Sequence, residues 1–574
     1  MTDRTATIDA EYRARWLALV PVAVVFAACL MLLWFLLPAA HDVLTESYEP
    51  TKTLRFFYTH GHAQHKWGPM TGFVFAPVYT ALLLFYRLMG QLGRISSVYP
   101  FGFADPIHDL GTLLFAARLT TLLAALTGVY YLARTLQRHL ASTLGPVLAV
   151  LLSLSTSMVL LEALVDTNPN GLMIAFLLFA LANYAAIILS GFTKRRAIAM
   201  AFFYIASLSC KELTSVTLVL PYLALIALGV FRARRNAVEG RRDLQIITLS
   251  CLSAFGFYLL INVIYAPGSW VERMRYVFGP LKDPAIWASA SQTYASYLLQ
   301  ALWAVAGSLG WAGVLVLIVS LVWTAIYPSS RLLLLWLPFL SHLIFTVATA
   351  GYMPPYFMLP LGPALCLPSA FVLSRMIETS TVSESLQAVT FTALTVLCAW
   401  MAFCATGLVR YTHTDSLVHT AVTEKIPTGS TINVVNLFSN NGGLPEPAMR
   451  GDVLLDPRPL FEIIRAPISD RPDYLLVSSD GQAWEREIKT RPARAAMLKK
   501  QVGFDYSTFT SYESLGYELT GVVQPTLPGW CRPHAVADSS EHLKENLLIY
   551  HRRGEFARKA SAVNAITATT HNNE

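Results

Sequence analysis

Residues 16–38 read WLALVPVAVVFAACLMLLWFLLP, an apolar run of 23 residues without a charged side chain. About 20 apolar residues in a helix cross a hydrocarbon core that is about 30 Å thick. The run is long for the core of a signal peptide, and no clear cleavage site follows it. We therefore expect it to be a retained first transmembrane helix.

Apolar runs of this kind recur along the 574 residues, separated by short basic loops. Only 14% of the residues are charged and 54% are hydrophobic, whereas soluble domains carry about 25% charged residues. These features predict a polytopic α-helical membrane protein with about eleven transmembrane helices. The predicted spans cover residues 16–38, 112–133, 144–163, 170–191, 198–210, 214–231, 245–265, 300–327, 331–349, 357–376 and 386–409.

The segment 70–90 is also apolar, but it follows Pro69 and contains Pro77, so we expect a juxtamembrane or re-entrant helix. With eleven spans, the basic clusters of the loops fall on one side, which the positive-inside rule makes cytoplasmic. These clusters are Arg4, Arg13 and Arg15; Arg134 and Arg138; Lys194, Arg195 and Arg196; and Arg232, Arg234, Arg235, Arg241 and Arg242. The N-terminus is then cytoplasmic and the C-terminus extracytoplasmic.

This topology divides the chain into a transmembrane domain (1–410) with an outer loop (39–111), an extracytoplasmic domain (411–560) and a disordered tail (561–574). Runs rich in Val, Ile, Leu and Tyr predict strands in the extracytoplasmic domain, and helical stretches lie between them. The predicted strands are Thr431–Leu437, Asp473–Ser478, Leu519–Gln524 and Leu547–Tyr550, and the predicted helices are Asp415–Glu424 and Trp484–Gln501. A small α/β fold is expected.

The outer loop 39–111 gathers polar side chains directly after an apolar span. A carboxylate there can act as a general base, and a lysine can hold a lipid phosphate. The alternative is an ordinary solvated loop. The candidates are Asp42, Glu46, Glu49, His65 and Lys66.

Arg118 lies inside the apolar start of the second span, where a charge is costly and marks a paired or functional site, unless it reaches the outer interface. Asp166 lies on the outer side, between the third and fourth spans. It is a candidate catalytic acid, and capping of the helix that begins near Pro169 explains it equally well.

Three further candidates lie at later span ends. Lys211 is followed by Glu212 at the outer end of the fifth span, where adjacent charges also mark ordinary turns. Tyr352 and Tyr356 flank Pro354 and Pro355 before the tenth span, where belt packing or substrate contact accounts for the tyrosines.

Several function classes have no support in the sequence. No Walker loop, dinucleotide fingerprint, GxSxG or HExxH occurs, and no cysteine spacing typical of a zinc site is present. The net charge of +7 comes from basic residues spread over loops between apolar runs, which argues against a nucleic-acid partner. No cofactor is therefore expected, and the sequence leaves a metal requirement open.

The order of these features resembles the GT-C glycosyltransferases, in particular the lipid-carrier-dependent group around protein O-mannosyltransferases and aminoarabinose transferases. The match rests on Asp42 near the start of the outer loop, the run Lys66-Trp-Gly-Pro69, Arg118-Leu119, Asp166, the lysine of SLSCKELT at 211, and YFMLPLGP at 356–363. Two departures are visible. The family's paired Asp-Glu is absent, because Val43 follows Asp42, and its arginine before the tyrosine is replaced by Pro355.

The resemblance implies transfer of a sugar from a polyprenyl-phosphate carrier to an extracytoplasmic lipid, glycan or protein acceptor, with inversion. It implies that Lys66 and Arg118 hold the phosphate and that Asp42 acts as the base, with Glu46 and Glu49 as rivals. The basic loops and the lack of Asn-x-Ser/Thr sites favour a bacterial inner membrane over the endoplasmic reticulum. A transporter or flippase of a lipid-linked intermediate is the main alternative, and a membrane scaffold is a third.

Overall fold

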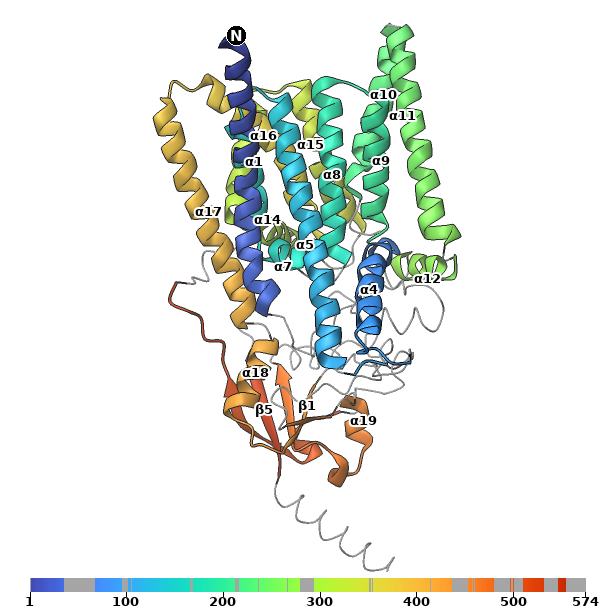
Figure 1. The fold of residues 1–574 in the computed structure, drawn as a ribbon, viewed down its shortest axis with the longest axis vertical. Coiled ribbons are helices and arrows are strands. Elements are labelled where there is room, and N and C mark those ends of the chain that lie inside the picture. Colours follow the sequence, from blue (N-terminus) through green and yellow to red (C-terminus); the bar gives the residue numbers. More distant parts are fainter. Residues whose placement is uncertain are drawn as a thin grey trace, which may run out of the picture.

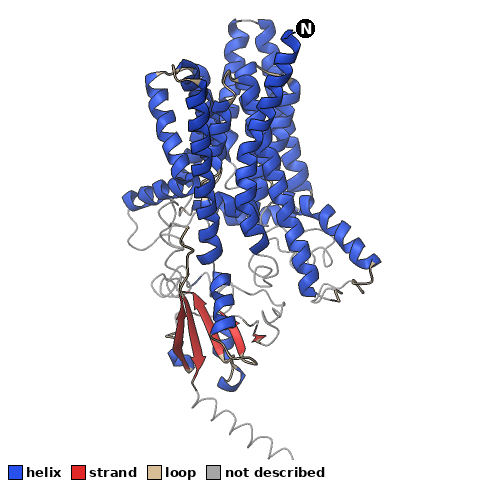
Figure 2. Cartoon of the chain, turned by 60° about the vertical axis from the view of Figure 1, so that its left-hand side comes forward, coloured by secondary structure: helices blue, strands red, loops and turns tan. Residues whose placement is uncertain are grey.

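The computed structural model of the 574-residue chain places a helical bundle above a small β-sheet (Figures 1 and 2). Its described residues are 2–35, 68–94, 102–104, 106–165, 169–211, 216–235, 237–265, 267–278, 294–349, 353, 355–412, 414–435, 453–456, 458, 460–478, 496, 499, 509–530 and 546–553.

Long helices form the bundle, and most of them run along its length (Figure 1). The α-helices up to residue 278 are α1 (Thr2–Phe35), α4 (Met70–Leu88), α5 (Pro106–His139), α6 (Leu144–Leu154), α7 (Met158–Val165), α8 (Pro169–Ser190), α9 (Lys194–Leu208), α10 (Val219–Arg235), α11 (Ala237–Tyr258) and α12 (Pro267–Phe278). The later ones are α14 (Tyr294–Ile326), α15 (Ser330–Thr349), α16 (Leu361–Thr379) and α17 (Glu384–Thr412). Short 3-10 turns are η2 (Val216–Leu218) and η5 (Pro355–Phe357), and η3 (Leu259–Ile264) is a π-helix that continues α11.

Nine helices among the described residues are long and apolar enough to cross a membrane, or ten if the bent pair α6–α7 counts as one span. Each of the eleven predicted spans overlaps helical residues, but α9, α16 and the bent pair α6–α7 are not among the nine, and α4 is. The architecture is that of a polytopic helical membrane protein. The count of eleven spans remains a prediction.

The predicted span 144–163 is wrong as a continuous helix, because α6 and α7 meet at an angle of 86°. At the corner, the Ser157 hydroxyl donates to the Gly307 carbonyl of α14 at 3.1 Å, and the Thr156 hydroxyl donates to the Leu309 carbonyl at 3.4 Å. Hydroxyls that bond to another helix offer the chain an alternative to its own helical ladder. Gly310 completes the joint: its φ is +68°, and a Cβ there would lie 2.3 Å from the Thr156 carbonyl oxygen.

The basic clusters gather at the end of the bundle where the N-terminus lies (Figure 1). Arg134 lies 3.7 Å from the Glu11 carboxylate of α1, which joins the end of α5 to the start of α1. Nη2 of Arg196, at the start of α9, lies 3.2 Å from Nε2 of His139. The sequence-based grouping of these residues on one side is therefore confirmed. The assignment of this side to the cytoplasm remains a prediction.

Helix α4 lies beside the end of α5 that projects from the bundle, close to the transverse helix α12 (Figure 1). Its length and composition suit a membrane span, so the juxtamembrane or re-entrant helix expected from the sequence remains a prediction.

A five-stranded sheet lies at the opposite end from the N-terminus among the described residues (Figure 2). Its strands are β1 (Thr431–Val434), β2 (Leu454–Leu455), β3 (Tyr474–Ser478), β4 (Tyr517–Val523) and β5 (Leu547–Arg552), in the order β2-β1-β3-β5-β4. The pairs β1–β2 and β1–β3 are parallel, whereas β3–β5 and β4–β5 are antiparallel. Helices α18 (Thr414–Glu424) and α19 (Leu460–Arg465) accompany it. Each of the four predicted strand segments overlaps a strand.

Candidate functional site

Lys211 follows α9 at the end of the bundle that faces the sheet, and its side chain is 3% exposed. Its Nζ donates to Oδ1 of Asn170, in the first turn of α8, at 2.8 Å. The same Nζ lies 4.8 Å from the centre of the Tyr356 ring, a cation–π contact. Lys211 and Tyr356, two candidates from the sequence that are 145 positions apart, are therefore in contact. Asn170 is a further partner of Lys211.

Tyr356 belongs to the 3-10 turn η5, which His342 of α15 supports from behind. Nε2 of His342 donates to the Phe357 carbonyl at 2.8 Å, and Nδ1 lies 3.4 Å from the Thr217 hydroxyl. The His342 ring is fully buried. This pairing fixes the backbone that carries the Tyr356 ring over Lys211.

The chain directly before Lys211 clamps the start of α4. The Gly68 N–H donates to the Cys210 carbonyl and the Met70 N–H to the Ser209 carbonyl, both at 3.1 Å. A Cβ on Gly68 would lie 1.8 Å from the Ser209 carbonyl oxygen, so only glycine permits this backbone approach. The outer loop 39–111 is thus attached to the bundle beside Lys211.

A third connection runs through the π-helix η3. Nδ2 of Asn262 donates to the Ser209 hydroxyl at 2.7 Å, and Oδ1 of Asn262 accepts from Nη2 of Arg273 at 3.4 Å. Asn262 is fully buried and Arg273 is 4% exposed. Single-turn π-helices occur frequently at functional sites. This one carries an amide that links α9 to the buried arginine of α12.

Arg118 contributes a further buried cation at the same end of the bundle, within α5. One turn later, Thr121 packs against the start of α8: a Cβ on Gly171 would lie 2.4 Å from Thr121 Cγ2 and 2.3 Å from the Ala163 carbonyl oxygen. Helices α5, α7 and α8 therefore meet closely at the first turn of α8. Arg118 lies one turn before Thr121 in α5, and Lys211 reaches the first turn of α8 from the end of α9.

Three buried cations lie toward this end of the bundle. Arg118, Lys211 and Arg273 are each less than 5% exposed, and buried charges in a membrane are costly unless anions or polar groups compensate them. The positive end of the α8 dipole lies in the same region. Such an arrangement suits a phosphate group. The described residues contain no cluster of His, Cys, Asp or Glu suited to a metal ion.

The other predicted site residues lie outside the described residues: Asp42, Glu46, Glu49, His65, Lys66, Asp166 and Tyr352. Their positions relative to Lys211 remain predictions. Along the chain, Lys66 precedes the clamped Gly68 by two residues, and Asp166 directly follows Val165, the last residue of α7.

The sequence-based search missed Asn170, Asn262 and Arg273. In the stretch around Pro169, Asp166 was chosen as the candidate and Asn170 was passed over. Asn262 is a single amide in an otherwise apolar span. A signal for Arg273 existed in the run PGSWVERMRYVF, where apolar and basic residues alternate as in an interfacial helix.

Fold and site together define a polytopic helical membrane protein with a buried cationic centre at the end opposite its N-terminus. No protein-family model and no curated protein sequence matches the chain. Among solved structures, it is similar to apo ArnT from Cupriavidus metallidurans, with 13% identity and a TM-score of 0.43 over 81% of this chain and 94% of ArnT. It is also similar to the same ArnT bound to undecaprenyl phosphate, with 11% identity and a TM-score of 0.42 over 93% and 98% of the two chains.

Proposed function

We propose that the chain is a GT-C-like membrane glycosyltransferase that moves a sugar from a polyprenyl-phosphate carrier to an extracytoplasmic acceptor. The observation that carries the proposal is the burial of Lys211 against Asn170 and Tyr356, with Arg118 and Arg273 buried at the same end of the bundle. A soluble anion has little access to such buried side chains, and we propose that the anion arrives on a lipid chain from the bilayer.

In the proposed reaction the cations stabilise the leaving group. The acceptor hydroxyl or amine attacks the anomeric carbon of the sugar, the bond from that carbon to the phosphate oxygen breaks, and the carrier leaves as polyprenyl phosphate with the bonding electron pair. Lys211, Arg118 and Arg273 are proposed to bind the phosphate, together with Lys66 of the outer loop. Fixed charges aimed at a developing anion in a site that excludes water lower the barrier strongly.

The attacking group loses a proton, which requires a base near the acceptor. We propose Asp42 for this role, with Glu46 and Glu49 as alternatives. These acids lie near the start of the outer loop 39–111, which is hydrogen-bonded to the bundle beside Lys211 at Gly68. Asp166 is the second proposed acid, since it lies between the described ends of α7 and α8. Attack from the face opposite the phosphate inverts the anomeric configuration.

Tyr356 and Asn170 are proposed to contact the sugar, and Tyr352 and His65 belong to the same proposed substrate surface. The acceptor is a lipid, a glycan or a protein on the side of the membrane that carries the sheet. A carrier-linked donor agrees with the lack of nucleotide-binding motifs. The proposed membrane is a bacterial inner membrane, with the N-terminus in the cytoplasm.

A direct test measures transfer of radiolabelled sugar from polyprenyl phosphate in membranes that contain the full chain. Asp42→Asn is expected to lower the transfer rate at least ~100-fold, as expected for loss of a general base. Glu46→Gln and Glu49→Gln serve as matched controls, and full activity of Asp42→Asn with loss in one of these would assign the base to that glutamate.

Mass analysis of the lipid carriers in the same reactions separates transfer from transport. The proposed enzyme converts the loaded carrier to free polyprenyl phosphate and glycosylated acceptor. Movement of the loaded carrier across the bilayer without a new glycosidic bond would instead establish a flippase. Undiminished transfer in Asp166→Asn would remove the second acid from the mechanism.

A further inference from the structure

The helices α10 and α11 form a hairpin that extends at the N-terminal end of the bundle (Figure 1). Residues 232–243 of this hairpin carry five arginines and two acidic residues, a net charge of +3. The two helices touch at their connection, since a Cβ on Gly240 would lie 2.0 Å from the Ala233 backbone nitrogen. The arginines therefore lie where α10 and α11 pack closely together, at one end of the bundle.

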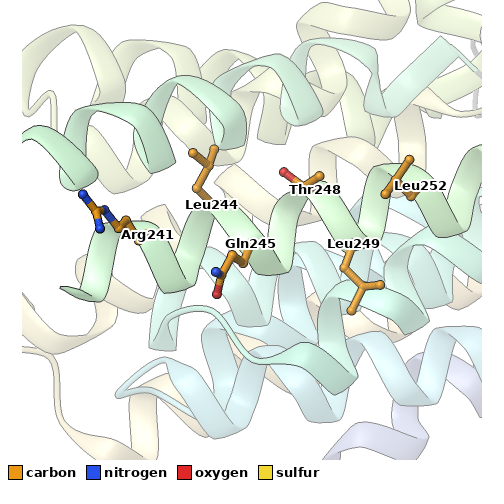
Figure 3. A pocket seen from close by; sticks show the side chains of 6 residues that line it. All are labelled: Arg241, Leu244, Gln245, Thr248, Leu249 and Leu252. Carbon is orange, nitrogen blue, oxygen red and sulfur yellow. The ribbon is translucent and has the colours of Figure 1, made fainter. Parts of the chain in front are cut away.

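A hollow of about 390 Å³ runs along the outer surface of α11 below these arginines. Figure 3 shows Arg241 at one end of its lining and Leu252 at the other. The lining side chains are Arg241, Leu244, Gln245, Thr248, Leu249 and Leu252. The hollow therefore has a cationic end, at the arginine-rich turn, and a mainly apolar remainder.

This hollow faces the surroundings of the bundle rather than its core. Only 17% of the most apolar window of Val238–Ile264 is buried, the smallest share among the nine candidate spans of the described residues. Leu252 is 63% exposed. In a membrane such a surface meets lipid chains.

The length of the hollow matches one leaflet. Arg241 and Leu252 are eleven residues apart on α11, which at 1.5 Å per residue is about 16 Å. Half of a hydrocarbon core of about 30 Å is about 15 Å. An acyl chain that begins at Arg241 would therefore end near the middle of the bilayer.

The charges of the hairpin favour an anionic headgroup. Nη1 of Arg232 lies 2.9 Å from the Asp243 carboxylate, so this acid already has a cationic partner. Arg241 remains at the mouth of the hollow, and Arg242, Arg234 and Arg235 raise the local positive potential. Basic pockets on the cytoplasmic side of helical membrane proteins bind anionic headgroups.

We propose that this hollow binds a phospholipid with an anionic headgroup from the leaflet at the N-terminal end of the bundle. The phosphate contacts Arg241, and one acyl chain lies along Leu244, Leu249 and Leu252. The site is separate from the centre around Lys211, which lies toward the opposite end of the bundle. Its proposed ligand is a membrane phospholipid rather than the sugar carrier.

The test uses the full-length protein, delipidated in detergent and titrated with dioleoyl phosphatidylglycerol or dioleoyl phosphatidylcholine, with bound lipid counted by native mass spectrometry. Phosphatidylglycerol is expected to bind more tightly than phosphatidylcholine. Arg241→Gln is expected to weaken its binding about fivefold, which corresponds to ~1 kcal/mol for one arginine at an anionic surface. Thr248→Trp fills the hollow and is expected to weaken binding at least as much.

Arg331→Gln is the matched control, because Arg331 is exposed at the start of α15 on the same end of the bundle but does not line the hollow. Its phosphatidylglycerol binding is expected to stay within twofold of that of the unaltered protein. An equal loss in Arg331→Gln and Arg241→Gln would overturn the site in favour of general surface attraction. Equal affinity for the two lipids or unchanged binding in Thr248→Trp would also overturn it.

Discussion

The Lys211 ammonium lies 2.8 Å from Oδ1 of Asn170, and this contact joins the end of α9 to the first turn of α8. The Tyr356 ring covers the ammonium at 4.8 Å from a third segment of the chain. A lysine held by an amide and an aromatic face keeps its charge in place within an apolar bundle. The charge is therefore positioned before any substrate arrives.

Replacing this charge tests its role in binding. Lys211→Met retains the length and the apolar stem of the side chain but removes the ammonium. We expect sugar transfer to fall about 100-fold, because a charge-assisted contact to phosphate contributes up to ~3 kcal/mol. Transfer rates in membranes that contain equal amounts of protein measure the effect.

Lys211→Arg is the matched variant for this experiment, since it retains the positive charge. We expect it to recover part of the lost activity. Full activity in Lys211→Met would remove the lysine from the site, whatever the outcome for arginine.

Arg273 offers a second, independent test. We expect Arg273→Gln to raise the KM for the polyprenyl-phosphate donor about tenfold, because one cation at the proposed phosphate site is lost. Glu272→Gln is the control, since Glu272 is the exposed neighbour of Arg273 on α12. A similar KM in the two variants would contradict a role for Arg273 in donor binding.

The close packing of the α6–α7 corner against α14 predicts a large loss of stability in Gly310→Ala. Alanine would have to adopt the φ of +68° that glycine has here, which is unfavourable for a residue with a Cβ. The new Cβ would also lie 2.3 Å from the Thr156 carbonyl oxygen. We expect a loss of at least ~2 kcal/mol, seen as a lower unfolding temperature in detergent. Gly256→Ala is the control: a Cβ there meets no atom within 4 Å, so stability should be unchanged or slightly higher.

In the sheet, the Tyr517 hydroxyl donates to the Pro472 carbonyl at 2.8 Å, and burial raises the pKa of Tyr517 above its ordinary value of 10. The unfolded chain ionises this tyrosine above about pH 10, whereas the folded sheet keeps it protonated, so the folded state loses stability as the pH rises. Tyr517→Phe should lower the free energy of unfolding by ~1 kcal/mol at pH 8. The variant should also lose less of its free energy of unfolding between pH 9 and pH 11 than the unaltered protein. Midpoints of urea unfolding measure both. An unaltered pH dependence would contradict this role of Tyr517.

The proposed orientation is also testable with reporters. Green fluorescent protein fused before Met1 should fluoresce, and alkaline phosphatase fused after Glu574 should be active, because phosphatase requires the oxidising side of the membrane. The reverse pattern would place the sheet and the Lys211 centre in the cytoplasm.

The length of the apolar runs was sufficient to predict most of the bundle, because spans of about 20 apolar residues have few alternative folds. The bend between α6 and α7 was not predictable in this way. It depends on hydroxyls of Thr156 and Ser157 that bond to α14, about 150 residues later in the chain. Strand β2 was missed because its two residues, Leu454 and Leu455, are too few to form a pattern.

The candidate site likewise contains residues that the sequence indicated and residues that it did not. Lys211 and Arg118 were visible in the sequence, because a charge within or beside an apolar run is conspicuous. Asn262 and Arg273 were not, since their importance comes from the meeting of η3, α9 and α12 in space. The order of residues predicted two of the three buried cations, Lys211 and Arg118, but neither Arg273 nor the amides of Asn170 and Asn262 that contact them.

The clamp on α4 has a consequence for biogenesis. When α4 leaves the ribosome, its apolar sequence is eligible for insertion by the translocon, yet the Ser209 and Cys210 carbonyls that receive Met70 and Gly68 are made well over a hundred residues later. Until then, the Gly68 and Met70 amides lack the carbonyl partners that they have in the folded protein. Docking of α4 is therefore a late assembly step, and the outer loop matures only after the fifth predicted span has been synthesised.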